Sequence, residues 1–277
     1  MTTTLNCKGR LLLIDEPIVM GILNATPDSF YTKGKENTLD GHLRKAEQML
    51  LEGASILDIG GMSTRPKAIE ISVTEELERV IPVIEKIRSN FPDAFLSIDT
   101  YRSIVAREAV NAGADIVNDI SAGSMDAEML RTVASLNVTY IAMHMRGKPS
   151  NMQEKPTYDN VAKDILQYLL ERIIACEQAG IKDIIIDPGF GFGKTMAHNY
   201  QLLKSLHTFQ ILEKALLVGV SRKSMIYKVL GTDAGTALNG TSVVHTLALQ
   251  QGAKILRVHD VREAVECIKI FSFYQTI

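Results

Sequence analysis

The chain has 277 residues, of which 46% are hydrophobic and 22% charged, enough to bury a sizeable core and to exclude a disordered chain. Its net charge of −2 gives no general attraction to nucleic acid or to an anionic membrane, so any positive site must be local. No apolar run approaches the ~18 residues of a membrane span, and the N-terminal residues lack the features of a signal peptide. The three cysteines are far apart and in no metal-binding pattern, which favours reduced thiols and a cytoplasmic location.

The chain is expected to begin with a short hairpin over residues 1–16 and then to alternate strands with helices. The strands are expected at residues 18–23, 56–59, 95–98, 116–117, 139–143, 184–186, 216–220 and 255–258. The helices are expected at about residues 40–53, 73–90, 102–112, 126–136, 158–179, 197–207 and 240–251, with a last helix closing the chain. Ala-Gly or Gln-Gly pairs mark several helix ends before the next strand.

This alternation predicts a parallel sheet with right-handed crossovers. Eight strand–helix units in a chain of this length predict an α/β fold, a closed (β/α)₈ TIM barrel. An open, doubly wound sheet is the alternative, but nothing in the sequence marks two edge strands. No linker divides the chain, so residues 1–277 are predicted to form a single domain.

Polar residues lie at or just beyond the end of every predicted strand. In a βα barrel the carboxyl ends of the strands meet at one mouth, where ligands bind. Any one of these residues is explained almost as well as a helix cap, whereas the whole set favours a polar ligand site. The set consists of Asn24, Asp58, Asp99, Asn118, His144, Asp187, Lys223 and His259.

The set divides by charge. The carboxylates and amide of Asp99, Asn118 and Asp187 can form hydrogen bonds with the edge of a flat heterocycle. Lys223 can donate to a carbonyl or nitrogen of the same ring. Groups suited to phosphate oxygens face them: Thr64-Arg65, Ser221-Arg222-Lys223, Arg257 and His259. Within that group, Arg222 is expected to be a surface charge. The chain therefore predicts an acidic pocket floor and a basic rim.

A glycine-rich loop follows the sixth strand, and its end, Gly193-Lys194-Thr195, matches the end of a P-loop. Pro188 stands where the first glycine of that motif belongs. The match is incomplete, so an NTPase is disfavoured.

Nearly the whole chain, from about residue 17 to 270, resembles the dihydropteroate synthases of the folate pathway. Five motifs carry the resemblance, in the order and at the barrel positions of that family: NATPDSF (24–30), DIGGMSTRP (58–66), DPGFGFGK (187–194), SRKS (221–224) and RVHD (257–260). The resemblance implies that the enzyme joins 6-hydroxymethyl-7,8-dihydropterin diphosphate to p-aminobenzoate with loss of pyrophosphate, and that sulfonamides compete with the aminobenzoate.

Roles for individual residues follow from the resemblance alone. It implies a pterin site made by Asp99, Asn118, Asp187 and Lys223, with Asp58 and Met145 in support. It implies a Mg²⁺ ligand in Asn24, and diphosphate contacts from Thr64, Arg65, Arg257 and His259. It implies an aminobenzoate pocket shaped by Arg65, Pro66, Phe190 and Ser221, and a homodimer formed through barrel helices.

The residues suit an ionising mechanism, in which pyrophosphate leaves and the electron-rich ring stabilises the remaining cation. Arg257, His259 and Mg²⁺ would stabilise the leaving group, Asp99 would stabilise the cation, and Lys223 would complete the catalytic set. The arylamine attacks a cation, so no general base is assigned.

The chain departs from the family pattern in two loops, at Tyr31-Thr32-Lys33 and at Met62 and Lys67. Two alternatives therefore stay open. One is a pterin-binding methyl-transfer domain, which would need neither the Ser63–Pro66 motif nor Arg257-Val258-His259. The other is a paralogue that binds pterin or phosphate without turnover.

Overall fold

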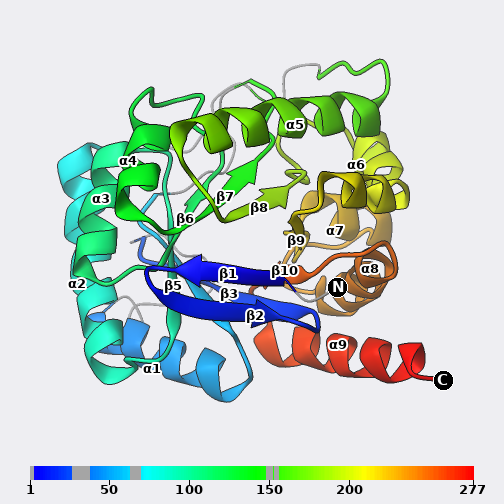
Figure 1. The fold of residues 1–277 in the computed structure, drawn as a ribbon. Helices are drawn as coiled ribbons and strands as arrows, with labels where there is room; N and C mark the ends of the chain where they lie inside the picture. Colours follow the sequence, from blue (N-terminus) through cyan, green and yellow to red (C-terminus); the bar gives the residue numbers. More distant parts are fainter. Residues whose placement is uncertain (1–2, 27–37, 63–69, 148–151, 153–155) are drawn as a thin grey trace.

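The computed structural model describes residues 3–26, 38–62, 70–147, 152 and 156–277. Its centre is a closed barrel in which each strand pairs in parallel with its neighbours, in the order β10-β3-β4-β5-β6-β7-β8-β9 (Figure 1). The strands are β3 (Ile18–Asn24), β4 (Ile56–Gly60), β5 (Phe95–Asp99), β6 (Ile116–Asp119), β7 (Thr139–Met143), β8 (Ile184–Asp187), β9 (Ala215–Val218) and β10 (Ile255–Val258). The predicted (β/α)₈ barrel is confirmed, and the open sheet is excluded.

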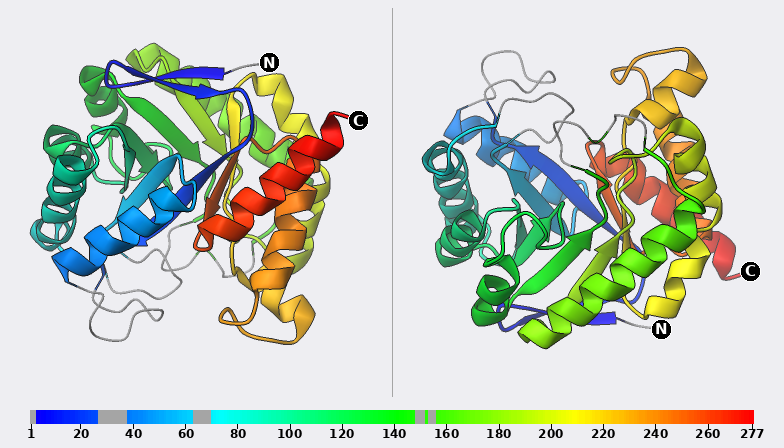
Figure 2. Two further views of the ribbon diagram at one scale, coloured as in Figure 1. Left: turned by 90° about the horizontal axis from the view of Figure 1, so that it is seen from below. Right: turned by 90° about the horizontal axis from the view of Figure 1, so that it is seen from above.

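Helices surround the barrel in both views of Figure 2. They are α1 (Leu39–Leu51), α2 (Val73–Asn90), α3 (Ser103–Ala112), α4 (Met129–Leu136), α5 (Val161–Ala179), α6 (Met196–Lys204), α7 (Ser224–Leu230), α8 (Leu238–Gln250) and α9 (Val261–Gln275), with a 3₁₀ helix at Leu206–Leu212. Within the described ranges, no helix is long and apolar enough to cross a membrane. The sequence missed α7, because seven residues are too few to display a helical period.

Local signals explain where the helices begin and end. The side chain of Asn160 accepts the backbone N–H of Lys163 at the start of α5, and Thr195 accepts that of His198 at the start of α6. The predicted glycine stop at Gly180 adopts a left-handed conformation with φ of 96°. These caps determine where α5 begins and ends and where α6 begins.

The barrel is sealed at the end where its strands begin. There, the predicted hairpin (β1, Thr3–Cys7, and β2, Arg10–Ile14) lies across the barrel in Figures 1 and 2. Its buried side chains join the inward-facing apolar residues of the barrel in one cluster: Leu5, Cys7, Leu12, Ile14, Met20, Ile56, Ile116, Ile141, Ile185, Ala215, Leu217 and Ile255. A dry plug at this end leaves the opposite end, where the strands finish, for a ligand.

Candidate functional site at the barrel mouth

Polar residues stand two positions beyond the apolar layer on several strands. Because alternate residues of a strand share one face, these side chains also point into the barrel. The pairs are Ile56 and Asp58, Ile116 and Asn118, Ile185 and Asp187, and Ile255 and Arg257. Asp99 lies in register with Gly60 on one side and Asn118 on the other. The predicted convergence of these residues on one mouth is therefore observed.

Arg257 joins two of the carboxylates. Its Nε donates to Asp58 Oδ2 at 2.6 Å and its Nη2 donates to Asp99 Oδ2 at 2.6 Å. Asn118 Nδ2 donates to the same Asp58 oxygen at 3.1 Å. Burial raises the pKa of Asp99 to about 7, against the opposing effect of Arg257. One cation between two carboxylates leaves a net negative floor, which suits a ring that presents N–H donors.

Asp187 and Lys223 interact electrostatically beside this network. Asp187 Oδ1 accepts the N–H of Gly189 at 2.7 Å, and Lys223 Nζ donates to the carbonyl of Phe190 at 2.5 Å. Burial raises the pKa of Asp187, and Lys223 opposes that shift. Burial lowers the pKa of Lys223 to about 8, and Asp187 opposes that shift in turn. Lys223 interacts electrostatically with Arg257 and Asp99 as well, which places the two networks around one small volume.

His259 lies at the rim and is bonded to Ser221. The Ser221 hydroxyl lies 3.0 Å from Nδ1 of His259 and accepts the backbone N–H of the same residue at 3.2 Å. The direction of the bond to Nδ1 depends on the imidazole tautomer, and a hydroxyl that donates to Nδ1 leaves the imidazole proton on Nε2. Burial and Arg257 lower the pKa of His259 to about 4. His259 is therefore a neutral hydrogen-bond donor, a correction to the expectation of a cationic group.

Beside the charged floor stands an apolar wall of methionine and aromatic side chains. It consists of Met62, Tyr101, Ile120, Met125, Met143, Met145, Met152 and Phe192. The predicted supporting residue Met145 belongs to it, at 9% exposure. Lys223 Nζ lies 4.8 Å above the ring of Phe192. A flat ring bound at the mouth would thus meet polar groups along its edge and an apolar surface along its face.

The prediction that Phe190 lines the aminobenzoate pocket was wrong, because the aromatic ring at the mouth belongs to Phe192, two positions later. The ring of Phe190 is fully buried in the core between barrel and helices, so it cannot line an open pocket. The ring of Phe192 is the one that lies at the mouth. The Gly189–Gly193 turn places alternate residues on opposite sides, and sequence alone does not show which side faces the barrel.

The sequence also failed to identify Lys194, which is only 3% exposed. Its Nζ donates to the carbonyls of Gly189 at 2.7 Å and Phe192 at 3.1 Å, and lies 2.9 Å from Nδ1 of His144. Burial lowers the pKa of His144 to about 2, so its imidazole is neutral. Lys194 therefore fixes the glycine loop from below. Its Nζ is bonded within the protein, where burial lowers the pKa of this amine well below its ordinary value.

Arg222 is not the surface charge that was expected. Its side chain is 11% exposed and is paired with Asp260 through two hydrogen bonds. This pairing could not be read from local sequence patterns, because the two residues are 38 positions apart.

Some predicted residues cannot be placed. Thr64, Arg65 and Pro66, together with the departures at Tyr31-Thr32-Lys33 and Lys67, lie outside the described residues. Asn24 is described; it ends β3, in register with Gly60, and is half-buried. The described residues contain no group of three or more His, Cys, Asp or Glu side chains that could hold a metal ion.

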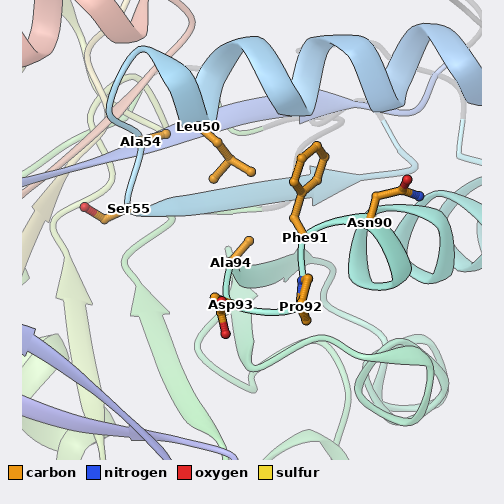
Figure 3. A pocket seen from close by; sticks show the side chains of 8 residues that line it. All are labelled: Leu50, Ala54, Ser55, Asn90, Phe91, Pro92, Asp93 and Ala94. Carbon is orange, nitrogen blue, oxygen red and sulfur yellow. The ribbon is translucent and has the colours of Figure 1, made fainter.

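A shallow hollow lies away from this site, between the end of α1 and the turn before β5 (Figure 3). It is lined by Leu50, Ala54, Ser55, Asn90, Phe91, Pro92, Asp93 and Ala94. Ser55 immediately precedes β4 and Ala94 immediately precedes β5, so the hollow lies where strands begin. It is therefore separate from the polar mouth.

Comparison with known proteins agrees with this geometry. The family model of the pterin binding enzymes matches residues 20–259. Dihydropteroate synthase of Escherichia coli (strain K12) is 46% identical over 265 residues, covering 95% of this chain and 93% of that protein. The Yersinia pestis enzyme, solved as a sulfonamide drug complex, has a TM-score of 0.95 at 43% identity, covering 99% of this chain and 100% of that one.

The Xanthomonas albilineans dihydropteroate synthase has been solved with 4-aminobenzoic acid, and matches with a TM-score of 0.93 at 42% identity and full coverage of both chains. In complex with 7,8-dihydropteroate it matches with a TM-score of 0.90 at 40% identity, covering 99% of this chain and 100% of that one. The chain therefore belongs to the pterin-binding enzyme family, among the dihydropteroate synthases.

Proposed function

We propose that this chain joins 6-hydroxymethyl-7,8-dihydropterin diphosphate to p-aminobenzoate, giving 7,8-dihydropteroate and pyrophosphate for folate biosynthesis, and that sulfonamides compete for the aminobenzoate site. The observation that carries the proposal is the arrangement at the barrel mouth. There, the network of Asp58, Asp99, Asn118 and Arg257 meets the pair of Asp187 and Lys223 beside a methionine-lined wall.

The pterin is proposed to lie flat in this mouth. Asp187 and Asn118 form hydrogen bonds with the N–H and acceptor groups along the ring edge, and Lys223 donates to a ring carbonyl or nitrogen. Met145 contacts the ring face. Because the floor carries net negative charge, it favours the positive charge that the pterinylmethyl group develops as the diphosphate departs.

The leaving group is proposed to depart toward the rim. Arg257 and the Nε2–H of His259 stabilise the charge that develops on the diphosphate, and Asp99 stabilises the charge that remains on the ring. Thr64 and Arg65 are proposed to bind the diphosphate, and Arg65 and Pro66 to shape the aminobenzoate pocket. Ser221 acts through its bond to His259, and Phe192 supplies the aromatic surface. The arylamine then attacks the exocyclic carbon, where correct placement matters more than a base.

A pyrophosphate-release assay with both substrates tests the proposal. Release that depends on p-aminobenzoate, and falls when a sulfonamide is added, supports the synthase. Pterin binding without release would instead indicate the methyl-transfer domain or the inactive paralogue.

Magnesium dependence gives the next prediction. Among the described residues, Asn24 is the one proposed to hold the metal, through its side-chain amide, so diphosphate oxygens and water would complete the oxygen coordination that Mg²⁺ prefers. When bound, the ion would neutralise charge on the leaving diphosphate. We expect EDTA to abolish turnover, and Asn24→Ala to raise the Mg²⁺ concentration for half-maximal rate by about tenfold or more. Asn90→Ala, at the other end of the barrel, should leave it unchanged; equal Mg²⁺ dependence in the two variants would refute the role of Asn24.

The pH profile of kcat/KM gives another testable prediction. The pKa of Asp99 is raised to about 7 and that of Lys223 is lowered to about 8. The active form needs a charged carboxylate and a charged ammonium, so kcat/KM should rise as the pH passes about 7 and fall as it passes about 8. Asp99→Asn should remove the acid limb and Lys223→Arg the alkaline limb. A profile that is flat across this range in the unmodified chain would contradict both assignments.

A homodimer is proposed through α8 and α9. One face of each helix is buried against the barrel, and the other face exposes apolar side chains. Val243 is 55% exposed and Leu247 is 42% exposed on α8, while Ile270 and Phe273 are 73% and 69% exposed on α9. Apolar side chains gathered on adjacent helices are typical of an interface. Sedimentation should show a dimer that Leu247→Glu converts to monomer; an unchanged mass would contradict this interface.

Two further proposals concern the chain as a whole. The continuous core between hairpin and barrel supports a single domain over residues 1–277. The three free cysteines support a reducing, cytoplasmic location.

A further inference from the structure

Arg222 lies in the chain between Ser221 and Lys223, two residues of the proposed site. Its side chain bonds to a different partner from either of theirs. Ser221 bonds to His259, and Lys223 bonds to the carbonyl of Phe190. The Arg222 guanidinium instead pairs with Asp260, its Nε donating to Oδ2 at 2.7 Å and its Nη2 to Oδ1 at 2.8 Å. Asp260 directly follows His259 in the chain. The pair therefore joins the loop after β9 to the loop after β10.

The same residue holds further segments in place. Its Nη1 donates to the carbonyls of Ala234 at 2.9 Å and Gly235 at 2.6 Å, in the connection between α7 and α8. Its backbone N–H donates to the hydroxyl of Thr241, on α8. A planar guanidinium presents five donors in a fixed fork, so it can bond a carboxylate at two points and two carbonyls at the same time.

The backbone at Arg222 is unusual as well. Its φ is 55°, in the left-handed region that residues with a side chain rarely adopt. Such a conformation persists only where the surroundings impose it, and it is found preferentially at functional sites. Here the turn lets consecutive side chains reach three separate partners: Ser221 reaches His259, Arg222 reaches Asp260, and Lys223 reaches the glycine loop.

We propose that Arg222 and Asp260 form a positioning pair, which holds the loops after β9 and β10 at one spacing and so aligns Lys223 with His259. The inference rests on the proposed function, in which Lys223 meets the pterin and His259 meets the leaving diphosphate. A neutral bond between Ser221 and His259 alone would allow the loops to move apart, whereas the bidentate charged pair beside it is shorter and stronger. The side chains of Arg222 and Asp260 are only 11% and 19% exposed. The pair therefore acts on the reaction by positioning Lys223 and His259 and not by contacting the substrates.

The test measures alignment rather than stability. Arg222→Met should lower kcat by about 100-fold, because displacements of about 1 Å in a site have effects of this size. The KM of each substrate should change far less, since Asp99, Asn118 and Asp187 also bind the pterin and do not depend on the pair. Asp260→Asn keeps the shape of the side chain and should change kcat in the same direction by a smaller factor. The double variant should be no slower than Arg222→Met, because the pair acts as a unit.

Arg88 provides a matched control at the opposite end of the barrel. Its guanidinium also binds a carboxylate, Asp115 at 2.5 Å, and the carbonyls of Pro92, Ala94 and Gly113. Arg88→Met should lower Tm as Arg222→Met does, but leave kcat within twofold of the unmodified chain.

Amide hydrogen exchange provides a second measurement, independent of turnover. Arg222→Met, but not Arg88→Met, should speed exchange of the His259 N–H, which is bonded to Ser221. Absence of turnover in the unmodified chain would refute the proposed function, while exchange would still test the pair. The inference fails if the Arg222→Met exchange rate is unchanged, if kcat falls equally in Arg88→Met, or if only KM changes. Should Arg222→Met not fold, Asp260→Asn is subject to the same three criteria.

Discussion

Asp187→Asn is expected to reduce kcat/KM by about 10⁴-fold without destabilising the protein. Asp187 Oδ1 accepts the N–H of Gly189 at 2.7 Å, which leaves Oδ2 to accept from the ligand. In the variant, the amide oxygen keeps the bond to Gly189, so the NH₂ group must face the ligand. Donor then meets donor at the pterin edge. A buried polar group left unpaired in this way is the strongest means by which a site rejects a ligand.

The stability of this variant follows from the same burial. Burial raises the pKa of Asp187 above its ordinary value, so its stabilising contribution is present only at low pH and is lost as the pH rises through that pKa. At neutral pH the burial of this charge opposes folding, and a neutral amide of the same shape removes that cost. The same change removes the carboxylate that favours the charged form of buried Lys223, which acts in the opposite direction. Tm should therefore change little, measured by thermal unfolding in parallel with pyrophosphate release.

Asp115→Asn is the matched control, with the opposite expectation. Asp115 is 3% exposed and its Oδ2 accepts from Arg10, Arg88 and the N–H of Leu96, at the sealed end of the barrel. Loss of this charge leaves two partly buried cations without their partner, and should cost about 3 kcal/mol of stability with kcat/KM unchanged. If Asp187→Asn retained kcat/KM, or lost stability as Asp115→Asn does, the carboxylate would be structural and the pterin assignment would be wrong.

The fold was predictable because its signals are local. Each strand shows as a short apolar run, each crossover as a helical period with a cap, and the polar strand ends show where the mouth lies. Strand parity then places Asp58, Asn118, Asp187 and Arg257 on one inner face without any knowledge of contacts.

What the sequence could not show depends on turns and on distant pairs. Which of Phe190 and Phe192 faces the mouth is decided by positive φ angles at Gly189, Gly191 and Gly193, and a sequence does not reveal how such a loop is folded. The partner of Arg222 is 38 residues away, and the lowered pKa of His259 depends on the burial and on Arg257. Charge state and pairing are tertiary properties, which explains why both were misjudged.

The glycine loop also gives the largest expected effect on folding, from Gly189→Ala. Gly189 has a φ of 70°, and a Cβ at this position would overlap the backbone carbonyl oxygen of His144. A carbonyl in the chain has no rotamer by which to move aside, so β7 and the loop must separate. We expect a loss of more than about 4 kcal/mol, the range reached only by severe core disruption. The loss should appear as a lower urea midpoint with an unchanged slope.

Gly231→Ala separates the overlap from the backbone conformation. Gly231 has nearly the same φ, 66°, but no atom lies within 4 Å of its added Cβ. It should therefore suffer only the left-handed penalty of about 1–2 kcal/mol. The difference between the two variants measures how rigidly His144 holds the loop that carries the Gly189 N–H to Asp187. Equal urea midpoints would mean that the loop yields freely, and in that case the position of Asp187 would be set by the ligand and not by the fold.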